Sequence, residues 1–104
     1  MQLPSHVRLV ENSWLARLAA YKMKAQAVAL VVGKTIYLHG VKQQEFLANP
    51  RWVRHELAHI AQYQRMGTLL FLSRYLWYSL RYGYYQNPLE QEARQAESEA
   101  FEQA

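Results

Sequence analysis

The stretch His55-Glu56-Leu57-Ala58-His59 follows the pattern HExxH. On a helix, residues four positions apart lie about one turn apart on the same face. Two imidazoles placed in this way can bind one zinc ion, each through a ring nitrogen. Glu56 lies beside that face, where it can act as a general base toward a zinc-activated water. The stretch therefore predicts a helix with two metal ligands and one catalytic carboxylate.

The residues around the motif favour such a helix. No proline or glycine interrupts residues 51–66, and Gly67 follows as a C-terminal cap. Leu57, Ile60 and Ala61 are available to pack into a core. The alternative is an ordinary helix with two surface histidines and a surface glutamate, because a short motif also occurs by chance.

The composition predicts one small globular domain over residues 1–104. Half of the residues (51%) are hydrophobic and 19% are charged, which is unlike a disordered chain. The chain has no cysteine. Structural zinc sites usually use thiolates, so zinc here has to be bound by histidine and carboxylate ligands. Such a ligand set favours a catalytic site with an open coordination position.

The net charge of +4 conceals an asymmetry. Residues 1–85 carry 11 Lys/Arg against 3 Glu (+8), whereas residues 86–104 carry one Arg against 5 Glu (−4). A basic body with an acidic last helix is typical of nucleic-acid binding, or of a last helix that docks on the body. We prefer the second interpretation and do not expect a nucleic acid as partner. A peripheral contact with a membrane stays open.

The N-terminus lacks the pattern of a signal peptide, and Arg74 and Arg81 interrupt the aromatic stretch 69–85. These observations predict a cytoplasmic protein.

The remaining patterns predict an α+β fold, with a small sheet and several helices. Asn12 and Ser13 are N-cap residues before a helix over 14–24. Residues 27–32 and 35–39 are expected to form a β-hairpin around Gly33 and Lys34, followed by a short helix over 43–47.

A linking helix over 69–82 and a final helix from Pro88 complete the prediction. Asn87 is a good cap and proline fits the first turn of a helix. The linking helix has an apolar stripe that we expect to pack into the core. The alternative for this stripe is an interfacial membrane helix with arginines at its polar edge. The stripe consists of Leu69, Leu72, Leu76 and Leu80.

Two histidines do not complete a catalytic zinc site, which usually has three protein ligands. No histidine follows His59, so the third ligand is a carboxylate or an upstream histidine. Glu90 and Glu92 lie on the predicted final helix. They are two positions apart and point in different directions, so we expect only one of them to bind.

The stretches His55–Gln62 (HELAHIAQ) and Asn87–Ala93 (NPLEQEA) resemble the gluzincin metallopeptidases, most of all the small single-domain minigluzincins. The resemblance covers most of the chain. It implies a zincin-like domain in which His55, His59 and Glu92 bind one zinc ion and Glu56 is the base. The implied activity is that of a zinc-dependent endopeptidase on a peptide or protein substrate.

The chain departs from this family at Ala96, where gluzincins often have an aspartate that orients a ligand histidine. Glu97, Asn87 or a backbone carbonyl would have to replace it. The departure motivates an alternative function, a weak or inactive zinc-binding module for regulation or interaction. A latent enzyme is a further alternative, with the acidic tail 97–104 covering the cleft.

A peptidase site also needs a donor for the oxyanion and a surface that binds the substrate backbone. The developing oxyanion needs a donor, and the candidates precede the final helix: Arg81, Tyr82, Tyr84 and Tyr85. An extended peptide is expected to add to the hairpin edge near residues 37–39.

Overall fold

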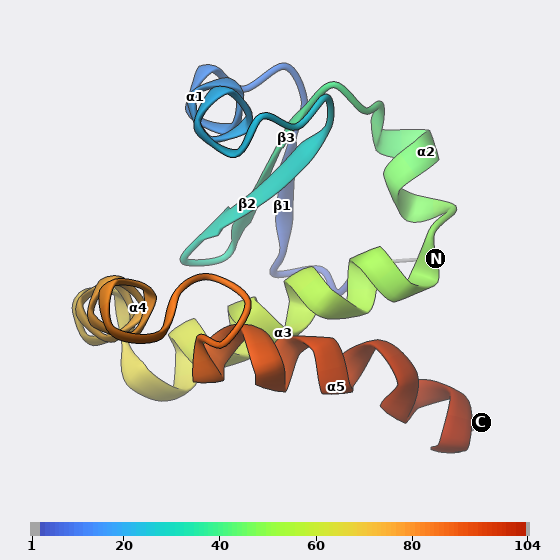
Figure 1. Cartoon of the computed structure of the whole chain (residues 1–104). Helices are drawn as coiled ribbons and strands as arrows, with labels where there is room; N and C mark the ends of the chain where they lie inside the picture. The colour runs from blue at the N-terminus through green and yellow to red at the C-terminus, as the bar shows by residue number, and fades with distance from the viewer. Residues whose placement is uncertain (1–2, 104) are drawn as a thin grey trace.

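The computed structural model describes the backbone of residues 3–103 and the side chains of residues 3–98. Within this range the chain forms five helices and three strands, which confirms the predicted α+β class (Figure 1). In chain order these are β1 (Arg8–Val10), α1 (Trp14–Met23), β2 (Val28–Val32), β3 (Thr35–His39), α2 (Gln43–Leu47), α3 (Pro50–Met66), α4 (Thr68–Tyr82) and α5 (Pro88–Gln103).

The sheet has the strand order β1-β3-β2. β2 and β3 form the predicted antiparallel hairpin, in which Val32 pairs with Thr35 across the two-residue turn. Gly33 has a φ of +63° in this turn, a conformation that glycine adopts without steric cost. β1 pairs in parallel with β3. β1 was not predicted, because a strand of three residues is too short for a period of two to be recognised.

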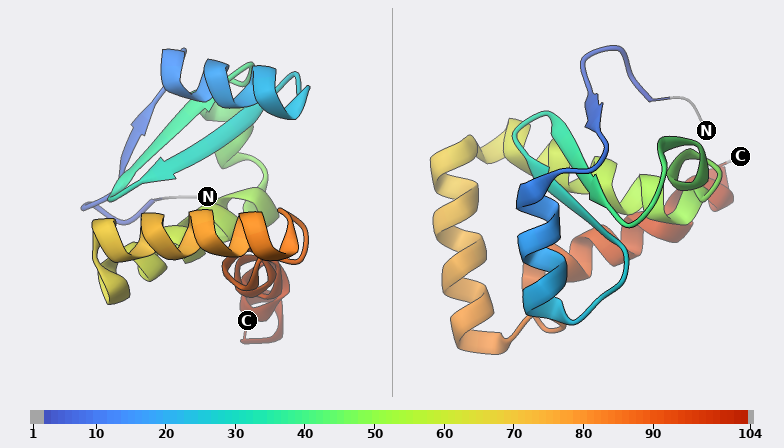
Figure 2. Two further views of the ribbon diagram at one scale, coloured as in Figure 1. Left: turned by 60° about the vertical axis from the view of Figure 1, so that its left-hand side comes forward. Right: turned by 90° about the horizontal axis from the view of Figure 1, so that it is seen from above.

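The layers of the molecule follow from the sheet. α1 packs on one side of the sheet and α3 lies on the other side, with α5 packed along α3 (Figures 1 and 2). The core between the sheet and α3 contains Ile36, Leu38, Val53 and Ile60, together with Phe46 of α2. Ile60 therefore packs as predicted, whereas Ala61 is exposed.

Side-chain caps fix where the helices begin. The Ser13 side chain accepts a hydrogen bond from the Ala16 backbone N–H at the start of α1. Asn49 accepts one from the Trp52 N–H at 3.2 Å, which positions the first turn of α3. Such caps satisfy backbone donors that have no partner within the helix. Asn49 lies six residues before His55, so its cap starts α3 between one and two turns ahead of the HExxH motif.

The leucine stripe of α4 does not pack into the core, which contradicts the first prediction for it. Leu69, Leu76 and Leu80 are 83%, 62% and 76% exposed, and Leu72 is also exposed. The aromatic side of the helix is buried instead, where Phe71 stacks on Tyr63 of α3 with ring centroids 3.8 Å apart. Both sides of this helix are apolar, so periodicity alone could not decide which of them faces inward.

Across the described residues, no helix combines the length and the apolar character that a membrane span requires.

Candidate metal centre

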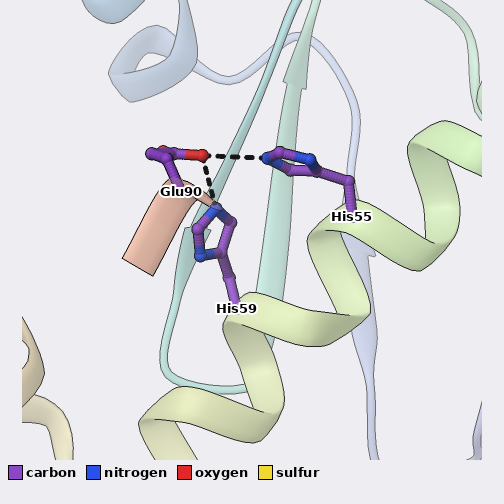
Figure 3. A group of neighbouring side chains, drawn as sticks. All are labelled: His55, His59 and Glu90. Carbon is purple, nitrogen blue, oxygen red and sulfur yellow. Dashed lines mark hydrogen bonds and ion pairs between the residues drawn. The ribbon is translucent and has the colours of Figure 1, made fainter. Parts of the chain in front are cut away.

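α3 and α5 bring three potential metal ligands together (Figure 3). Nε2 of His55 lies 2.9 Å from Oε1 of Glu90, and Nε2 of His59 lies 3.1 Å from the same oxygen. The three ligand atoms all lie within 4.8 Å of one another. His59 and Glu90 are buried and His55 is partly buried. The predicted pairing of the two histidines on one helix face is therefore present, with a carboxylate opposite them.

Glu90 occupies the position that the sequence analysis expected for Glu92. Residues two apart on a helix differ by about 200° in direction, so only one of the two carboxylates can face the histidines. Glu92 is half exposed and accepts hydrogen bonds from Gln62 and Arg65, each at 3.0 Å. The structure therefore does not bring Glu92 to the two histidines. These partners also lower the pKa of its carboxyl.

Gln62 determines the orientation of the His59 ring. Its side-chain nitrogen donates to the Leu89 carbonyl oxygen and to Glu92, both at 3.0 Å. The amide oxygen consequently faces His59 Nδ1, at 2.9 Å, and has to accept a hydrogen bond from it. This assignment places a proton on Nδ1 and leaves Nε2 as the metal-binding nitrogen. Glu92 thus acts on the centre only indirectly: it accepts a hydrogen bond from the Gln62 amide, and Gln62 in turn orients His59.

Glu97 performs the same task for His55. Its Oε2 lies 2.8 Å from His55 Nδ1, and a carboxylate in this position accepts the Nδ1 proton. Glu90 and Glu97 are seven residues apart on α5, about two helical turns, so both face α3. Glu97 was one of the residues expected to replace the missing aspartate. Asn87, the other candidate side chain, instead donates to the Tyr75 carbonyl oxygen and to Ser79.

The electrostatics of the group reflect its buried charges. Burial lowers the pKa of His55, but hydrogen bonds to Glu90 and Glu97 and the charge of Glu56 outweigh burial and raise it to about 9. Burial opposes protonation of His59 as well, yet Glu90 raises its pKa too. The pKa of Glu90 is lowered despite burial, because both histidines donate to it. Without a metal, Glu90 thus favours protonation of both rings, and a metal ion has to compete with protons at their Nε2 atoms.

Glu56 lies between the two histidines in the sequence. Its side chain is buried and lines the same cleft as theirs. Burial raises the pKa of its carboxyl to about 7, although His59 and His55 act in the opposite direction. A carboxylate with a pKa near neutrality is suited to accept and return a proton at physiological pH. Glu56 is therefore a buried carboxyl, beside the two histidines, that can exchange a proton near neutral pH.

The three ligands lie in a cleft of about 740 Å³. One side of the cleft is formed by β2 and α1, and the other by α4. Because β3 lies between β1 and β2, the sheet edge beside the ligands belongs to β2. The edge expected near residues 37–39 lies on β3, the central strand, where Tyr37 pairs with Val10 of β1; this pairing was not foreseen.

Three tyrosines line the cleft: Tyr63, whose hydroxyl donates to the Val31 carbonyl oxygen, and Tyr75 and Tyr84. Tyr75 donates a short hydrogen bond to Oε2 of Glu90, and burial together with the Glu90 charge raises its pKa. Burial raises the pKa of Tyr84 to about 12, so it remains a hydroxyl donor. Of the predicted oxyanion donors, only Tyr84 lines this cleft. Tyr75 was missed, because it lies within the leucine-rich helix and carries no motif.

The other predicted donors have different neighbours. The Arg81 guanidinium lies 5.7 Å from the ring centroid of Tyr82. The Arg94 guanidinium lies over the Tyr85 ring at 4.2 Å. All three predicted residues (Arg81, Tyr82 and Tyr85) are exposed. They are therefore surface residues beside the cleft rather than part of its lining.

The donor set fits a metal ion. Two imidazole nitrogens and one carboxylate oxygen converge, and both histidines have partners that direct Nε2 to the centre. This is the arrangement of ligands and supporting residues that a protein metal site requires. His55, His59 and Glu90 can thus bind one metal ion.

A match to the eCIS core domain family covers residues 2–67, more than half of the chain. The chain belongs to this family. The matched segment of the eCIS core domain includes the sheet, α1, α2 and the complete HExxH helix, and it ends before α4 and α5. Glu90 and Glu97 consequently lie outside it. No curated protein and no solved structure matches the chain.

Proposed function

We propose that this eCIS core domain is a zinc-dependent peptidase of the gluzincin type. The observation that carries the proposal is the convergence of His55, His59 and Glu90 next to a buried Glu56, inside a cleft. A non-catalytic zinc site usually has four protein ligands, most often with thiolates. Here three protein ligands without any cysteine face a cleft, which favours a site with an open position for substrate.

The proposed zinc ion would be held by Nε2 of each histidine and by the Glu90 carboxylate. When bound, zinc acts as a Lewis acid that lowers the pKa of water and polarises a carbonyl group. The choice of zinc rests on the HExxH spacing and on the imidazole and carboxylate donors. Nothing in the donor set requires a second ion.

The side chains of this domain would perform the remaining steps. Glu56 accepts the proton of the attacking water and passes it to the leaving amine, for which a pKa of about 7 is suited. The Tyr84 hydroxyl donates to the developing oxyanion from the cleft wall. The free edge of β2 binds the substrate backbone as an added strand, so that the scissile bond lies over the histidines.

Metal content decides the ligand set. Glu90→Ala should lose stoichiometric zinc, and His59→Ala should do so as well. The matched control is Glu92→Ala, which removes a carboxylate two positions away on the same helix and should retain zinc. Loss of zinc in Glu92→Ala with retention in Glu90→Ala would refute the proposed centre.

Activity is tested separately, by digestion of a broad peptide library with zinc-loaded protein and with Glu56→Gln. Cleavage that disappears in Glu56→Gln, while zinc remains, supports the peptidase. Zinc binding without cleavage of any peptide would instead indicate the non-catalytic zinc-binding module.

Latency by the acidic tail is a third outcome for the same site. Of residues 97–104, Glu97 lies at His55, and the side chains from 99 onward are outside the described residues. A chain that ends after Ser98 keeps Glu97 and tests this directly. Higher activity of the shortened chain supports latency, and unchanged activity contradicts it.

A further inference from the structure

The exposed hydrophobic residues of this domain are concentrated in one region. Among the described side chains, each large hydrophobic residue that is exposed lies on α1, on α4 or in the loop directly after α4. We call these residues the apolar rim. They are Trp14, Leu18, Tyr21 and Met23 of α1, Leu69, Leu70, Leu72, Leu76, Trp77, Leu80 and Tyr82 of α4, and Tyr84 and Tyr85 of the loop.

The apolar rim borders the cleft, because Met23, Leu72 and Tyr84 belong both to the rim and to the cleft lining. α1 and α4 lie on the same side of the molecule, above and below the end of the β-hairpin (Figure 1). Seen from above, their axes run roughly parallel (Figure 2, right), and the end of the β-hairpin lies between the two helices (Figure 1). Met23 of α1 and Leu72 of α4 are exposed and also line the cleft from opposite sides. Large exposed apolar surfaces on soluble domains usually mark a place where something binds.

The charged residues on the two helices of the apolar rim, and on the C-cap of α1, all have one sign. Arg17, Lys22 and Lys24 lie on α1 and its C-cap, and Arg74 and Arg81 lie on α4. All five side chains are exposed. Neither helix contains an acidic residue: no Asp or Glu occurs between Glu11 and Glu45 or between Glu56 and Glu90.

We propose that the apolar rim docks α1 and α4 onto an anionic lipid bilayer surface. Leucine and tryptophan on one helix face, with arginine and lysine beside them, are the features of helices that lie in a membrane interface. Each basic residue near an anionic leaflet adds attraction, and Trp and Tyr favour the headgroup region. The two short helices lie on the bilayer surface and do not cross it.

Charge argues against a second copy of the chain as the occupant of this surface. Two apolar rims that faced each other would bring two sets of five exposed cations together, and neither α1 nor α4 carries a carboxylate that could pair with them. Like charges in such an interface are repulsive, whereas an anionic leaflet neutralises them. The apolar area and the charge therefore favour the same partner, a bilayer with acidic headgroups.

The experiment is flotation of the complete chain with lipid vesicles. One set contains phosphatidylcholine with about one third phosphatidylserine, and the other contains phosphatidylcholine alone. We expect binding to the anionic vesicles, at least about tenfold weaker binding to the neutral ones, and loss of affinity in about 0.5 M salt. No binding to the anionic vesicles would overturn the proposal.

The double variant Leu76→Glu/Leu80→Glu tests the surface. It should reduce binding to anionic vesicles at least about tenfold, because it inserts charge where the apolar contact forms. The matched control is Gln44→Glu/Gln95→Glu, with the same change in net charge on α2 and α5, away from the apolar rim (Figure 1). Equal loss of binding in the control and in the double variant would show general charge attraction and overturn the proposal.

A second double variant, Leu18→Glu/Tyr21→Glu on α1, provides the same test if the α4 variant does not fold, as judged by circular dichroism. Sedimentation velocity without lipid completes the experiment. Self-association of the native chain that the α4 variant abolishes, with no vesicle binding, would identify a second copy as the occupant and refute the lipid. Glu56→Gln should bind vesicles like the native chain, so docking and peptidase activity can fail independently.

Discussion

The interface between α3 and α5 buries polar side chains, whereas the outer sides of α1 and α4 expose apolar ones. In the first region Glu56, His59, Gln62 and Glu90 are buried polar side chains. In the second, Trp14 is 74% exposed and Leu80 is 76% exposed. Folding stability alone favours neither arrangement, because buried charges and exposed apolar surface both cost free energy. Both regions therefore point to binding, of an ion in the first and of a surface in the second.

The largest expected effect concerns the buried polar region. Glu56→Gln removes the proposed base and preserves the shape of the side chain. Peptide cleavage should fall by about 10²–10⁴-fold, as expected for the loss of a general base. Zinc content, measured by atomic emission, should not change. Cleavage at the native rate would exclude Glu56 as the base.

Two substitutions in α4 compare its buried aromatic side with its exposed leucine stripe. Phe71→Ala should lower the free energy of unfolding by about 3–5 kcal/mol, because Phe71 is 4% exposed and stacks on Tyr63. Leu69→Ala, two positions earlier and 83% exposed, should change it by less than about 0.5 kcal/mol. Urea unfolding of metal-free protein measures both. Similar costs for the two variants would contradict the exposed position of the leucine stripe.

Loss of the Glu97 carboxylate should weaken zinc binding about 10–100-fold, because it leaves His55 Nδ1 without its acceptor. Glu97→Gln retains an oxygen that can accept the same proton and should recover part of the affinity. Gln95→Ala, on an exposed position of the same helix, is the control. Competition with a fluorescent chelator measures the dissociation constants. If Glu97→Ala and Gln95→Ala bind zinc equally, Glu97 does not orient the ligand.

The smallest effect is the pH dependence of the metal-free protein. His55 has a pKa of about 9, above its ordinary value of 6.5, so its contribution to stability is complete below pH 6.5 and is lost as the pH rises through 9. Glu56 has a pKa of about 7 instead of 4.5, so it also lowers the stability as the pH rises from 4.5 to 7. Because the pKa of Glu90 is lowered, its ionised carboxylate stabilises the fold, and this stabilisation is lost as the pH falls below 4.5.

The melting temperature without metal should consequently be highest near pH 5–6 and should fall toward pH 9. Stabilisation by added zinc should rise over the same interval, because fewer protons have to be displaced from the two histidines. Thermal melts with a chelator and with zinc measure the two curves. A metal-free protein that becomes more stable from pH 6 to pH 9 would contradict the shared hydrogen bonds of Glu90.

Much of the fold could be predicted from the sequence because its signals are local. Ser13, Asn49 and Asn87 mark where helices begin, and Gly33 marks the hairpin turn. These residues act on their own backbone within a few positions. β1 was missed because its formation depends on pairing with β3, about 27 positions later in the chain.

The sequence by itself determined the half of the centre that one helix contains. His55 and His59 share a face of α3 whatever surrounds them, because helical geometry sets the direction of residues four apart. Only the tertiary structure decided the other half. The rotation of α5 against α3 turns Glu90 and Glu97 inward and leaves Glu92 at the side, beside Gln62 and Arg65. The packing of Phe71 on Tyr63 likewise decided that the leucines of α4 face outward, since side chains from different helices compete for the same core.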